Sequence, residues 1–260
     1  MYSLIFYPLK GRKRSFEINK AGHSSLMEQV YKNMNEVPLP KTKAFDIEKE
    51  LTPMPMPIDL PLILGSSSSS RQKILMMLDW TFEILKPDID EKAIRCDDHM
   101  LLPVLIAKAK AAAILEDTAH FEYPFVLLTA DQIVYFQGTV REKPVGKEEA
   151  TMFLESYSGN AVSTISAVVA THFPSGRQAY EVDVATVYWK EISPEIIENV
   201  VRRGDIYESA GGFRIEDDDL NGCIQEVQGT LDSVLGLPVE ATIRVLAAVA
   251  EEPNEEKSYK

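Results

Sequence analysis

The sequence places five serines and an arginine, residues 66–71, between the apolar run Leu62–Leu64 and the apolar run Ile74–Leu78. A free serine tract is typical of a flexible linker, but this one is enclosed by segments that a folded chain buries. The pattern predicts a short strand, a hydroxyl-rich turn and then a helix. Hydroxyls and backbone N–H groups at the N-terminus of a helix bind anions, and Arg71 adds a positive charge to the first turn. We therefore expect this turn to hold a phosphate group.

Length and charge narrow the class of protein. The chain has 260 residues, of which 45% are hydrophobic, so it can bury one sizeable core. Its net charge of -13 at pH 7 argues against binding to a nucleic-acid duplex, which needs a broad basic face, although a local positive pocket for a small anion is compatible. Two cysteines without CxxC spacing favour a reducing compartment, and we expect a cytoplasmic protein. Because residues 1–20 are basic and poor in acidic residues, an organelle transit peptide is a weaker alternative.

The chain divides into an arm, a domain and a tail. Residues 1–60 include five prolines between positions 38 and 57 and show little apolar periodicity, so we expect a mostly extended or disordered arm. Residues 251–260 form a charged tail. Between them, residues 61–250 mix apolar runs of helical and of extended spacing, which predicts one α/β domain with a mixed twisted sheet flanked by helices. No apolar stretch approaches the roughly 18 residues that span a bilayer, so we expect no membrane association.

The individual elements follow from apolar periodicity and from the positions of proline and glycine. We predict strands at residues 61–65, 82–85, 125–128 with a continuation at 133–136, 161–171 and 178–189. The last two flank Pro174-Ser175-Gly176, which is a hairpin signal. We predict helices at residues 71–78, 101–115, 147–157, 194–203 and 238–249. Ser193 followed by Pro194 is typical of an N-cap and a first helical position.

Acidic side chains at two places suit hydrolytic chemistry. Asp131 follows the apolar run 125–128, and a carboxylate at the end of a buried strand points into the crevice where α/β sheets bind ligands. An aspartate that caps a turn is an equally good interpretation. The acidic residues of segment 87–91, among them Glu91, have the oxygen ligands that Mg²⁺ or Mn²⁺ prefers, although a solvated acidic loop is the better interpretation of this segment alone. For the run Asp217–Asp219 we also favour a solvated loop.

Other site types find no support in the sequence. The chain has neither GxxxxGK[ST] nor GxGxxG, no serine in a GxSxG elbow, and four scattered histidines. Lys110 and Lys143, taken singly, are best read as surface lysines. Together with Arg71, the serines and the carboxylates, however, they form a set that suits metal-assisted attack of water on a phosphate anhydride.

In this order along the chain, the residues resemble the Maf family of nucleoside triphosphate pyrophosphatases, the septum-formation-inhibitor family. The resemblance runs from about Leu62 to Val249. It includes the family's S-x-S-x-x-R pattern at Ser66, Ser68 and Arg71 and its A-x-x-K-A pattern around Lys110. The other matching segments are Pro87–Glu91, Thr129–Gln132, Glu142–Pro144, Ser158–Val162, Ala210–Glu216 and Leu235–Pro238. Each motif is short, but their common order and spacing are hard to explain otherwise.

The resemblance implies cleavage between the α and β phosphates of a nucleoside triphosphate, which gives a monophosphate and pyrophosphate. It assigns Asp131 as the proton acceptor, and Glu91 together with Asp131 as ligands of a divalent cation, Mg²⁺ or Mn²⁺. It assigns Lys110 and Lys143 to catalysis and to the triphosphate. The residues that it implies for substrate binding are Ser66, Ser68, Arg71, Gln132, Ser158 and Glu216. The family also suggests a homodimer.

The resemblance also bears on the base. Members that act on dTTP and UTP usually carry A-D-T at the aspartate, and members that act on 7-methyl-GTP more often carry S-D-Q and A-G-S-F-K-x-E. Gln132 and Glu216 in this chain favour 7-methyl-GTP, since a carboxylate can accept hydrogen bonds from guanine and attracts the positive methylated ring. A dTTP/UTP pyrophosphatase is the alternative within the family. A nucleotide-binding regulator of cell division without turnover is the alternative from another functional class, and a paralogue that has lost activity is the third alternative.

Overall fold

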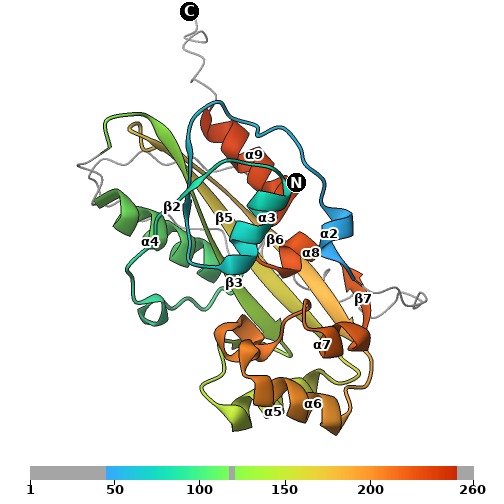
Figure 1. Cartoon of the computed structure of the whole chain (residues 1–260). Coiled ribbons are helices and arrows are strands. Elements are labelled where there is room, and N and C mark those ends of the chain that lie inside the picture. Colours follow the sequence, from blue (N-terminus) through green and yellow to red (C-terminus); the bar gives the residue numbers. More distant parts are fainter. Residues whose placement is uncertain (1–44, 117–120, 251–260) are drawn as a thin grey trace, which may run out of the picture.

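The computed structural model of the protein describes residues 45–116 and 121–250. Most of the predicted arm, residues 1–44, and the predicted tail, residues 251–260, lie outside the described residues. Within the described residues, seven strands form one mixed sheet in the order β2-β1-β3-β5-β6-β7, with β4 beside β3 (Figure 1). The strands are β1 Leu62–Gly65, β2 Glu83–Ile84, β3 Phe125–Phe136, β4 Thr139–Arg141, β5 Ala161–Phe173, β6 Gln178–Trp189 and β7 Ile224–Gln228. The predicted α/β domain with a mixed sheet is confirmed.

The sheet is parallel at one edge and antiparallel elsewhere. β1 pairs in parallel with β2 and β3, while the pairs β3–β4, β3–β5, β5–β6 and β6–β7 are antiparallel. The helices are α2 Ile47–Glu50, α3 Ser69–Met77, α4 Leu102–Glu116, α5 Lys147–Tyr157, α6 Pro194–Arg203, α7 Asp218–Cys223, α8 Leu231–Val234 and α9 Val239–Ala250. Short 3-10 turns lie at Glu91–Ala93, Asp205–Glu208 and Ala210–Gly212. None of the helices in the described segments is both long and apolar enough to cross a membrane.

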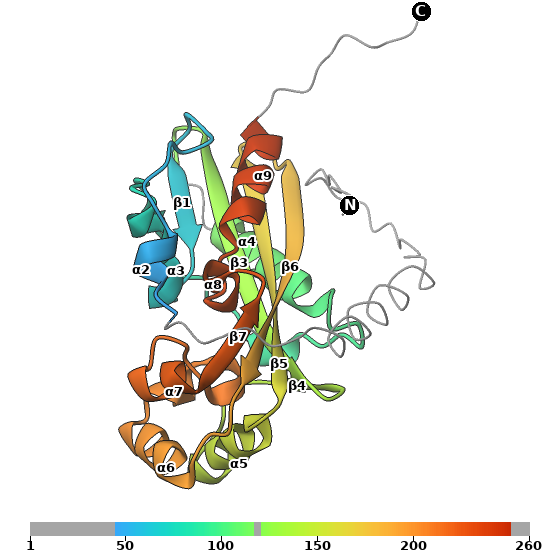
Figure 2. The ribbon, with the colours of Figure 1, turned by 90° about the vertical axis from the view of Figure 1, so that its right-hand side faces the viewer.

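The alternation of side chains along β1 and β3 buries both faces of the upper sheet. Leu62 and Leu64 pack with α3 and α9, while Ile63 packs with α4 on the opposite face. Figure 2 shows α3 and α9 on one side of the sheet and α4 on the other. These apolar layers explain why β1 and the first half of β3 are continuous hydrophobic runs, as is usual for strands that are covered on both faces.

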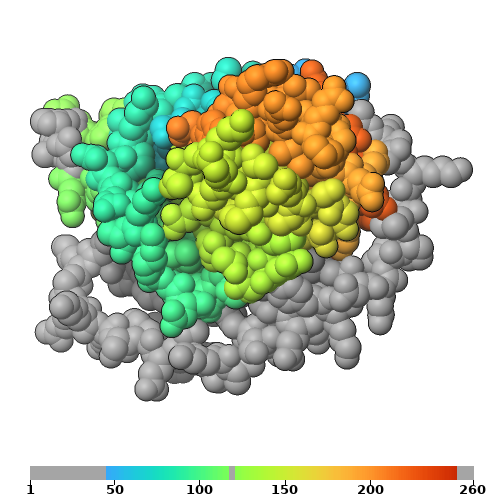
Figure 3. Space-filling model, turned by 90° about the horizontal axis from the view of Figure 1, so that it is seen from below, coloured from blue at the N-terminus to red at the C-terminus, as the bar shows by residue number. Residues whose placement is uncertain are grey.

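The long strands extend below this layer into a lobe that contains α5, α6 and α7. Its core surrounds Tyr157, Trp189 and Phe213, whose rings meet edge to face. Figure 3 shows the lobe from below, with the yellow-green segment of α5 beside the orange segment that includes α6. The buried apolar side chains of the described residues thus form four clusters on one sheet, and the turn after β1 faces the junction between the lobe and the upper layers.

Most predicted elements are found close to their predicted bounds. The helix predicted at residues 71–78 begins two residues earlier, because the Ser68 hydroxyl accepts a hydrogen bond from the backbone N–H of Arg71 and so caps α3. The Ser193 cap and Pro194 are found as predicted. The solvated loop predicted for 217–219 is wrong. Asp217 is the N-cap of α7, and with Asp219 it binds the Arg203 guanidinium.

Residues 45–60, which belong to the predicted arm, lie on the domain. They include α2, and the side chains of Ile47 and Ile58 are buried in the two main apolar clusters. The boundary at residue 60 stays a prediction, but this part of the chain packs on the domain.

Gly65, the last residue of β1, allows close packing with its neighbours. A Cβ atom there would lie 2.6 Å from Cγ2 of Thr129 and 2.7 Å from Cδ1 of Ile114. We expect Gly65→Ala to lower the free energy of unfolding by about 1–3 kcal/mol, because overpacking displaces the core. Gly222→Ala is the matched control, since a Cβ there meets no atom within 4 Å and the position is helical. Thermal unfolding of both variants checks this, and equal melting temperatures would contradict it.

Candidate active site

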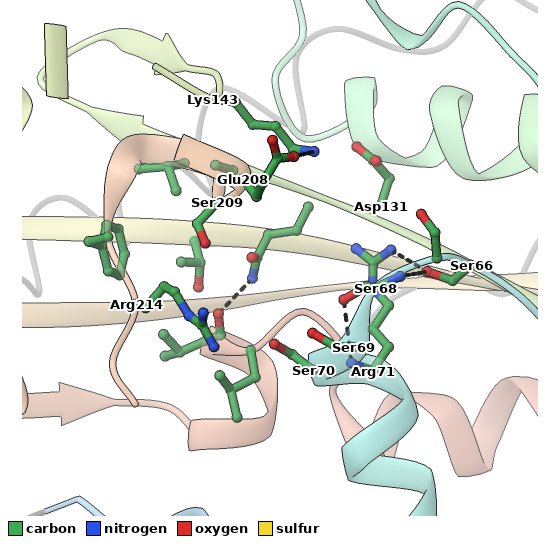
Figure 4. A pocket seen from close by; sticks show the side chains of 18 of the residues that line it. Ser66, Ser68, Ser69, Ser70, Arg71, Asp131, Lys143, Glu208, Ser209 and Arg214 are labelled. Carbon is green, nitrogen blue, oxygen red and sulfur yellow. Dashed lines mark hydrogen bonds and ion pairs between the residues drawn. The ribbon is translucent and has the colours of Figure 1, made fainter. Parts of the chain in front are cut away.

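A cavity of about 460 Å³ lies where the turn after β1 faces the lobe. Figure 4 shows Ser66 and Asp131 at one end of it and Arg214 at the other, with Lys143 and Glu208 near the rim. All of the predicted site residues except Ser158 line it. The wall is strongly polar, and its described residues are Ser66–Arg71, Pro87, Glu91, Lys110, Asp131, Gln132, Val134, Lys143, Thr164, Asp205, Glu208–Ala210, Phe213–Glu216, Val234 and Leu235.

The serine turn, residues 66–70, is fixed in its conformation by hydrogen bonds of its own side chains. The Ser66 hydroxyl accepts one from the backbone N–H of Ser68 at 3.2 Å, and the Ser68 hydroxyl caps α3 at the N–H of Arg71. The first turn of α3 therefore faces the cavity with serine hydroxyls and with the positive end of the helix dipole. This is the anion-binding geometry that the sequence predicts for residues 66–71.

Arg71 is a buried cation whose position is fixed by three contacts. Its Nε donates to the Gly236 carbonyl at 2.9 Å, and its Nη1 donates to the Ala130 carbonyl at 2.8 Å and to the Ser66 hydroxyl at 3.2 Å. Burial lowers the pKa of the guanidinium, while the nearby carboxylates of Asp131 and Glu91 oppose that shift. Because an arginine stays protonated in proteins, the cavity has a permanent positive charge at this point.

Lys110 lies between the two carboxylates that the sequence singles out. Its Nζ is 2.7 Å from Oδ1 of Asp131 and 2.9 Å from Oε1 of Glu91. Asp131 and Lys110 are both buried, whereas Glu91 is half exposed. Burial raises the pKa of the Asp131 carboxyl, and the positive charges of Lys110 and Arg71 oppose the rise. The pair thus combines a carboxylate of increased basicity with a cation that keeps it oriented.

The same two carboxylates fit a divalent cation. One oxygen of each carboxylate contacts the Lys110 ammonium, so a cation would use the remaining oxygens, and Mg²⁺ is usually bound through one or two carboxylates together with substrate phosphates. The acidic residues that line the cavity, Glu91, Asp131, Asp205, Glu208 and Glu216, outnumber its basic residues, Arg71, Lys110, Lys143 and Arg214. No group of three or more histidine, cysteine or carboxylate side chains that could hold a metal occurs in the described ranges. Ligands from a bound anion would therefore complete such a site.

The end of the cavity away from Asp131 is formed by Ser70, Arg214 and Glu216. The Ser70 hydroxyl donates to Oε1 of Glu216 at 3.4 Å, and Nε of Arg214 lies 3.9 Å from Oε2 of Glu216. Gln132 also lines the cavity, but its amide nitrogen donates to the carbonyls of Ser233 and Val234. These contacts fix the orientation of the Gln132 amide, and the carboxylate of Glu216 remains as a hydrogen-bond acceptor at the cavity wall.

Lys143 lies near the rim, where its Nζ is 3.3 Å from Oε2 of Glu208. Both side chains are more than half exposed, so the pair is screened and can separate at little cost. Glu208 and Ser209 also line the cavity, although no local sequence pattern sets them apart. Their position follows from the fold of segment 205–212 against the end of β3.

Ser158 is not a lining residue of the cavity. Its hydroxyl accepts a hydrogen bond from the backbone N–H of Ile192 at 2.8 Å, and the residue is the C-cap of α5. These contacts give Ser158 a structural role at the end of α5, and the substrate contact predicted for it gains no support from this position.

Comparison with known proteins agrees with this geometry. Residues 61–249 match the family model described as Maf-like protein. A 7-methyl-GTP pyrophosphatase of Dictyostelium discoideum is 33% identical over 195 residues, which cover 74% of this chain and 98% of that relative. A 7-methyl-GTP pyrophosphatase of Idiomarina loihiensis is 28% identical over 187 residues, or 72% of this chain and 93% of the relative. A dTTP/UTP pyrophosphatase of Shewanella denitrificans is 31% identical over 199 residues, or 74% and 98%.

The three contacts of Arg71 suggest a test of its structural role. Arg71→Lys keeps the charge but cannot reproduce the guanidinium fork, so it leaves buried acceptors without a donor. We expect the free energy of unfolding to fall by about 1–3 kcal/mol. Arg95→Lys is the control, because Arg95 is exposed and its main contact is an ion pair with Glu142. Denaturant unfolding of the two variants measures the difference, and an unchanged Arg71→Lys midpoint would argue against a fixed guanidinium.

Proposed function

The chain belongs to the family of Maf-like proteins, and on that premise we propose that it is a nucleoside triphosphate pyrophosphatase. Water attacks at the anhydride between the α and β phosphates, the bridging P–O bond breaks, and the products are a nucleoside monophosphate and pyrophosphate. The observation that carries this proposal is the buried Lys110–Asp131 pair, 2.7 Å apart, which shares the cavity with the serine turn and Arg71. A carboxylate of raised pKa beside an anion site is what hydrolysis of a phosphate anhydride needs.

The triphosphate is bound at the N-terminus of α3. Ser66, Ser68 and the backbone N–H groups of the turn contact phosphate oxygens, and the charge of Arg71 lies behind them. Lys143 exchanges its exposed contact with Glu208 for a phosphate oxygen when the substrate enters. Because Arg71 is already held by three protein contacts, the triphosphate meets a preformed positive potential and little binding energy goes into ordering this side chain.

Asp131 accepts the proton of the attacking water. Burial raises the pKa of its carboxyl, which makes it a better base than an exposed aspartate, and Lys110 holds one of its oxygens so that the other is available. Glu91 and Asp131 would hold Mg²⁺ or Mn²⁺, which when bound supplies positive charge against the phosphates. Lys110 then remains close enough to orient Asp131 and to offset charge on the departing pyrophosphate.

For the base we propose 7-methylguanine. Glu216 has a carboxylate at the end of the cavity away from Asp131, where it can accept hydrogen bonds from the N1–H and amino groups of guanine and attract the methylated ring. Relatives of this chain bear the name 7-methyl-GTP pyrophosphatase, and others bear the name dTTP/UTP pyrophosphatase, so the pyrimidine triphosphates are the second candidate. A binder without turnover is disfavoured, since binding alone does not need a buried carboxylate that accepts a proton.

The proposal includes a homodimer and a cytoplasmic location. The family resemblance supports the first, and the low cysteine content supports the second. A nucleic-acid duplex is not an expected partner, because the chain has a net charge of -13.

Replacing the proposed base tests the chemistry. We expect Asp131→Asn to lower kcat for pyrophosphate release by about 10²- to 10⁴-fold, because the amide cannot accept the proton at neutral pH. The assay uses Mg²⁺ or Mn²⁺ with 7-methyl-GTP, GTP, UTP, dTTP and CTP. Asp79→Asn is the matched control, since Asp79 is a turn residue with φ of 59°, a conformation that asparagine also adopts. Full activity of Asp131→Asn would overturn the mechanism, and no release by the unmodified enzyme would overturn the function.

Neutralising Glu216 tests the proposed base. In Glu216→Gln we expect the ratio of kcat/KM for 7-methyl-GTP over GTP to fall by about tenfold, because an amide attracts the cationic ring less than a carboxylate does. Glu195→Gln in the exposed first turn of α6 is the control. A preference for UTP and dTTP in the unmodified enzyme would keep the chemistry and exclude 7-methylguanine. A ratio that the substitution does not change would exclude Glu216 as the group that recognises the base.

A further inference from the structure

Residues 45–58, which we call the N-terminal brace, precede the segment that the family model matches, residues 61–249. Two of its side chains are buried in the domain. Ile47 is 7% exposed and belongs to the apolar cluster that contains Leu231 and Val234 of α8, and Ile58 is 5% exposed in the cluster that contains Ile74 of α3. The brace therefore adds apolar anchors next to two helices that form the cavity wall.

The first contact of the brace is with α8. Helices α2 and α8 pack against each other and lie side by side in Figures 1 and 2. Desolvation raises the pKa of the Glu50 carboxyl at the end of α2, and a hydrogen bond from the backbone of Leu231 opposes this rise. The residues of α8 and the turn after it supply the carbonyls that hold Gln132 and Arg71, namely those of Ser233, Val234 and Gly236. A shift of α8 would thus move acceptors of two side chains that line the cavity.

The second contact is with the segment that carries Glu216. The Asn221 side chain donates from Nδ2 to the Phe45 carbonyl at 2.8 Å and accepts at Oδ1 from the Phe45 N–H at 3.3 Å. The same Nδ2 donates to the Ile215 carbonyl at 2.9 Å. Asn221 therefore joins the start of the brace to the residue that precedes Glu216.

The third contact is with α3, whose N-terminus carries the serine turn. The Trp80 indole N–H donates to the Met54 carbonyl at 3.0 Å, and the Met54 N–H donates to the Leu78 carbonyl at 3.2 Å. An exposed ion pair of 3.0 Å between Glu48 and Lys73 adds little energy. The brace is thereby attached to the end of α3 that lies opposite the anion site.

We propose that the N-terminal brace is a positioning element of the active site, in which Ile47 holds α8 so that its carbonyls keep Arg71 and Gln132 aligned with the triphosphate. The family domain thus depends, in this chain, on residues outside it. The effect on turnover rests on the proposed pyrophosphatase function, whereas the effect on the cavity wall does not.

The test uses the full chain with Ile47→Ala, the conservative Ile47→Val, and Lys49→Ala as the matched control. The side chain of Lys49 is 82% exposed and pairs with Asp46 of its own segment. Hydrogen exchange is followed at the backbone amides of residues 234–237 and, for comparison, in α4. In Ile47→Ala we expect exchange at residues 234–237 to accelerate by about tenfold with α4 unchanged. Ile47→Val and Lys49→Ala should exchange like the unmodified protein.

Steady-state kinetics with 7-methyl-GTP supplies the second measurement. We expect KM in Ile47→Ala to rise by about 5- to 10-fold while kcat changes by less than about twofold, because a misaligned Arg71 weakens binding in the ground state and the transition state alike.

If Ile47→Ala does not fold, Glu50→Gln, which weakens the acceptor for Leu231, should accelerate exchange at the same amides. Unchanged exchange at 234–237, equal acceleration throughout the fold, or a normal KM despite local opening would each overturn the proposal. Absence of pyrophosphate release by the unmodified enzyme would refute the proposed function. Hydrogen exchange at residues 234–237 would still test whether the brace positions α8.

Discussion

The buried guanidinium of Arg71 joins the elements that form the cavity. Arg71 is a residue of α3, and its guanidinium donates to Ser66 of the serine turn, to the Ala130 carbonyl of β3 and to the Gly236 carbonyl after α8. A buried cation without partners would cost several kcal/mol, so these segments can be stable only in an arrangement that satisfies it. The same requirement that fixes the fold at this point also fixes a positive charge beside Ser66 and Asp131. Stability and the proposed anion site therefore have one physical cause.

The buried ion pair of Asp131 with Lys110 explains why the position of the carboxylate is fixed. Asp131 lies within β3 and not at its end, since β3 continues to Phe136, and the backbone of β5 pairs with it at Ala167. The rigid strand sets the position of the side chain, and Lys110 from α4 sets its orientation at 2.7 Å. Removing either charge leaves the other buried, which is unfavourable. Such a pair adds little net stability, and the proposed proton transfer gives a reason for burying it.

The sequence predicts best the features that depend on near neighbours. The cap and proline at Ser193–Pro194 and the helix at 147–157 are found as predicted, because capping and apolar periodicity are local. Failures occur where a distant residue decides. Asp217 looks like part of a solvated run until Arg203 and the N–H groups of α7 are placed around it, and Gln132 looks free to read a base until the carbonyls of α8 engage its amide. Arg71 and Asp131 could be singled out from the apolar runs beside them, whereas Lys110 and Glu91 could be assigned to the site only through the family pattern.

Helix α8 shows why the segment before the family domain matters. It has four residues, and Thr230 at its N-cap makes no side-chain cap hydrogen bond, so a helix of this length cannot be stable by itself. Its position must come from packing, and part of that packing is Ile47. Within the domain, Asp232 adds a bond to the N–H of Val239 at 2.5 Å, which holds the far side of α8 to the start of α9. One side of α8 is thus fixed by the domain and the other by residues that precede it. The positions of the carbonyls that orient Arg71 and Gln132 therefore also depend on this packing, because the position of a backbone acceptor is set by the element that carries it.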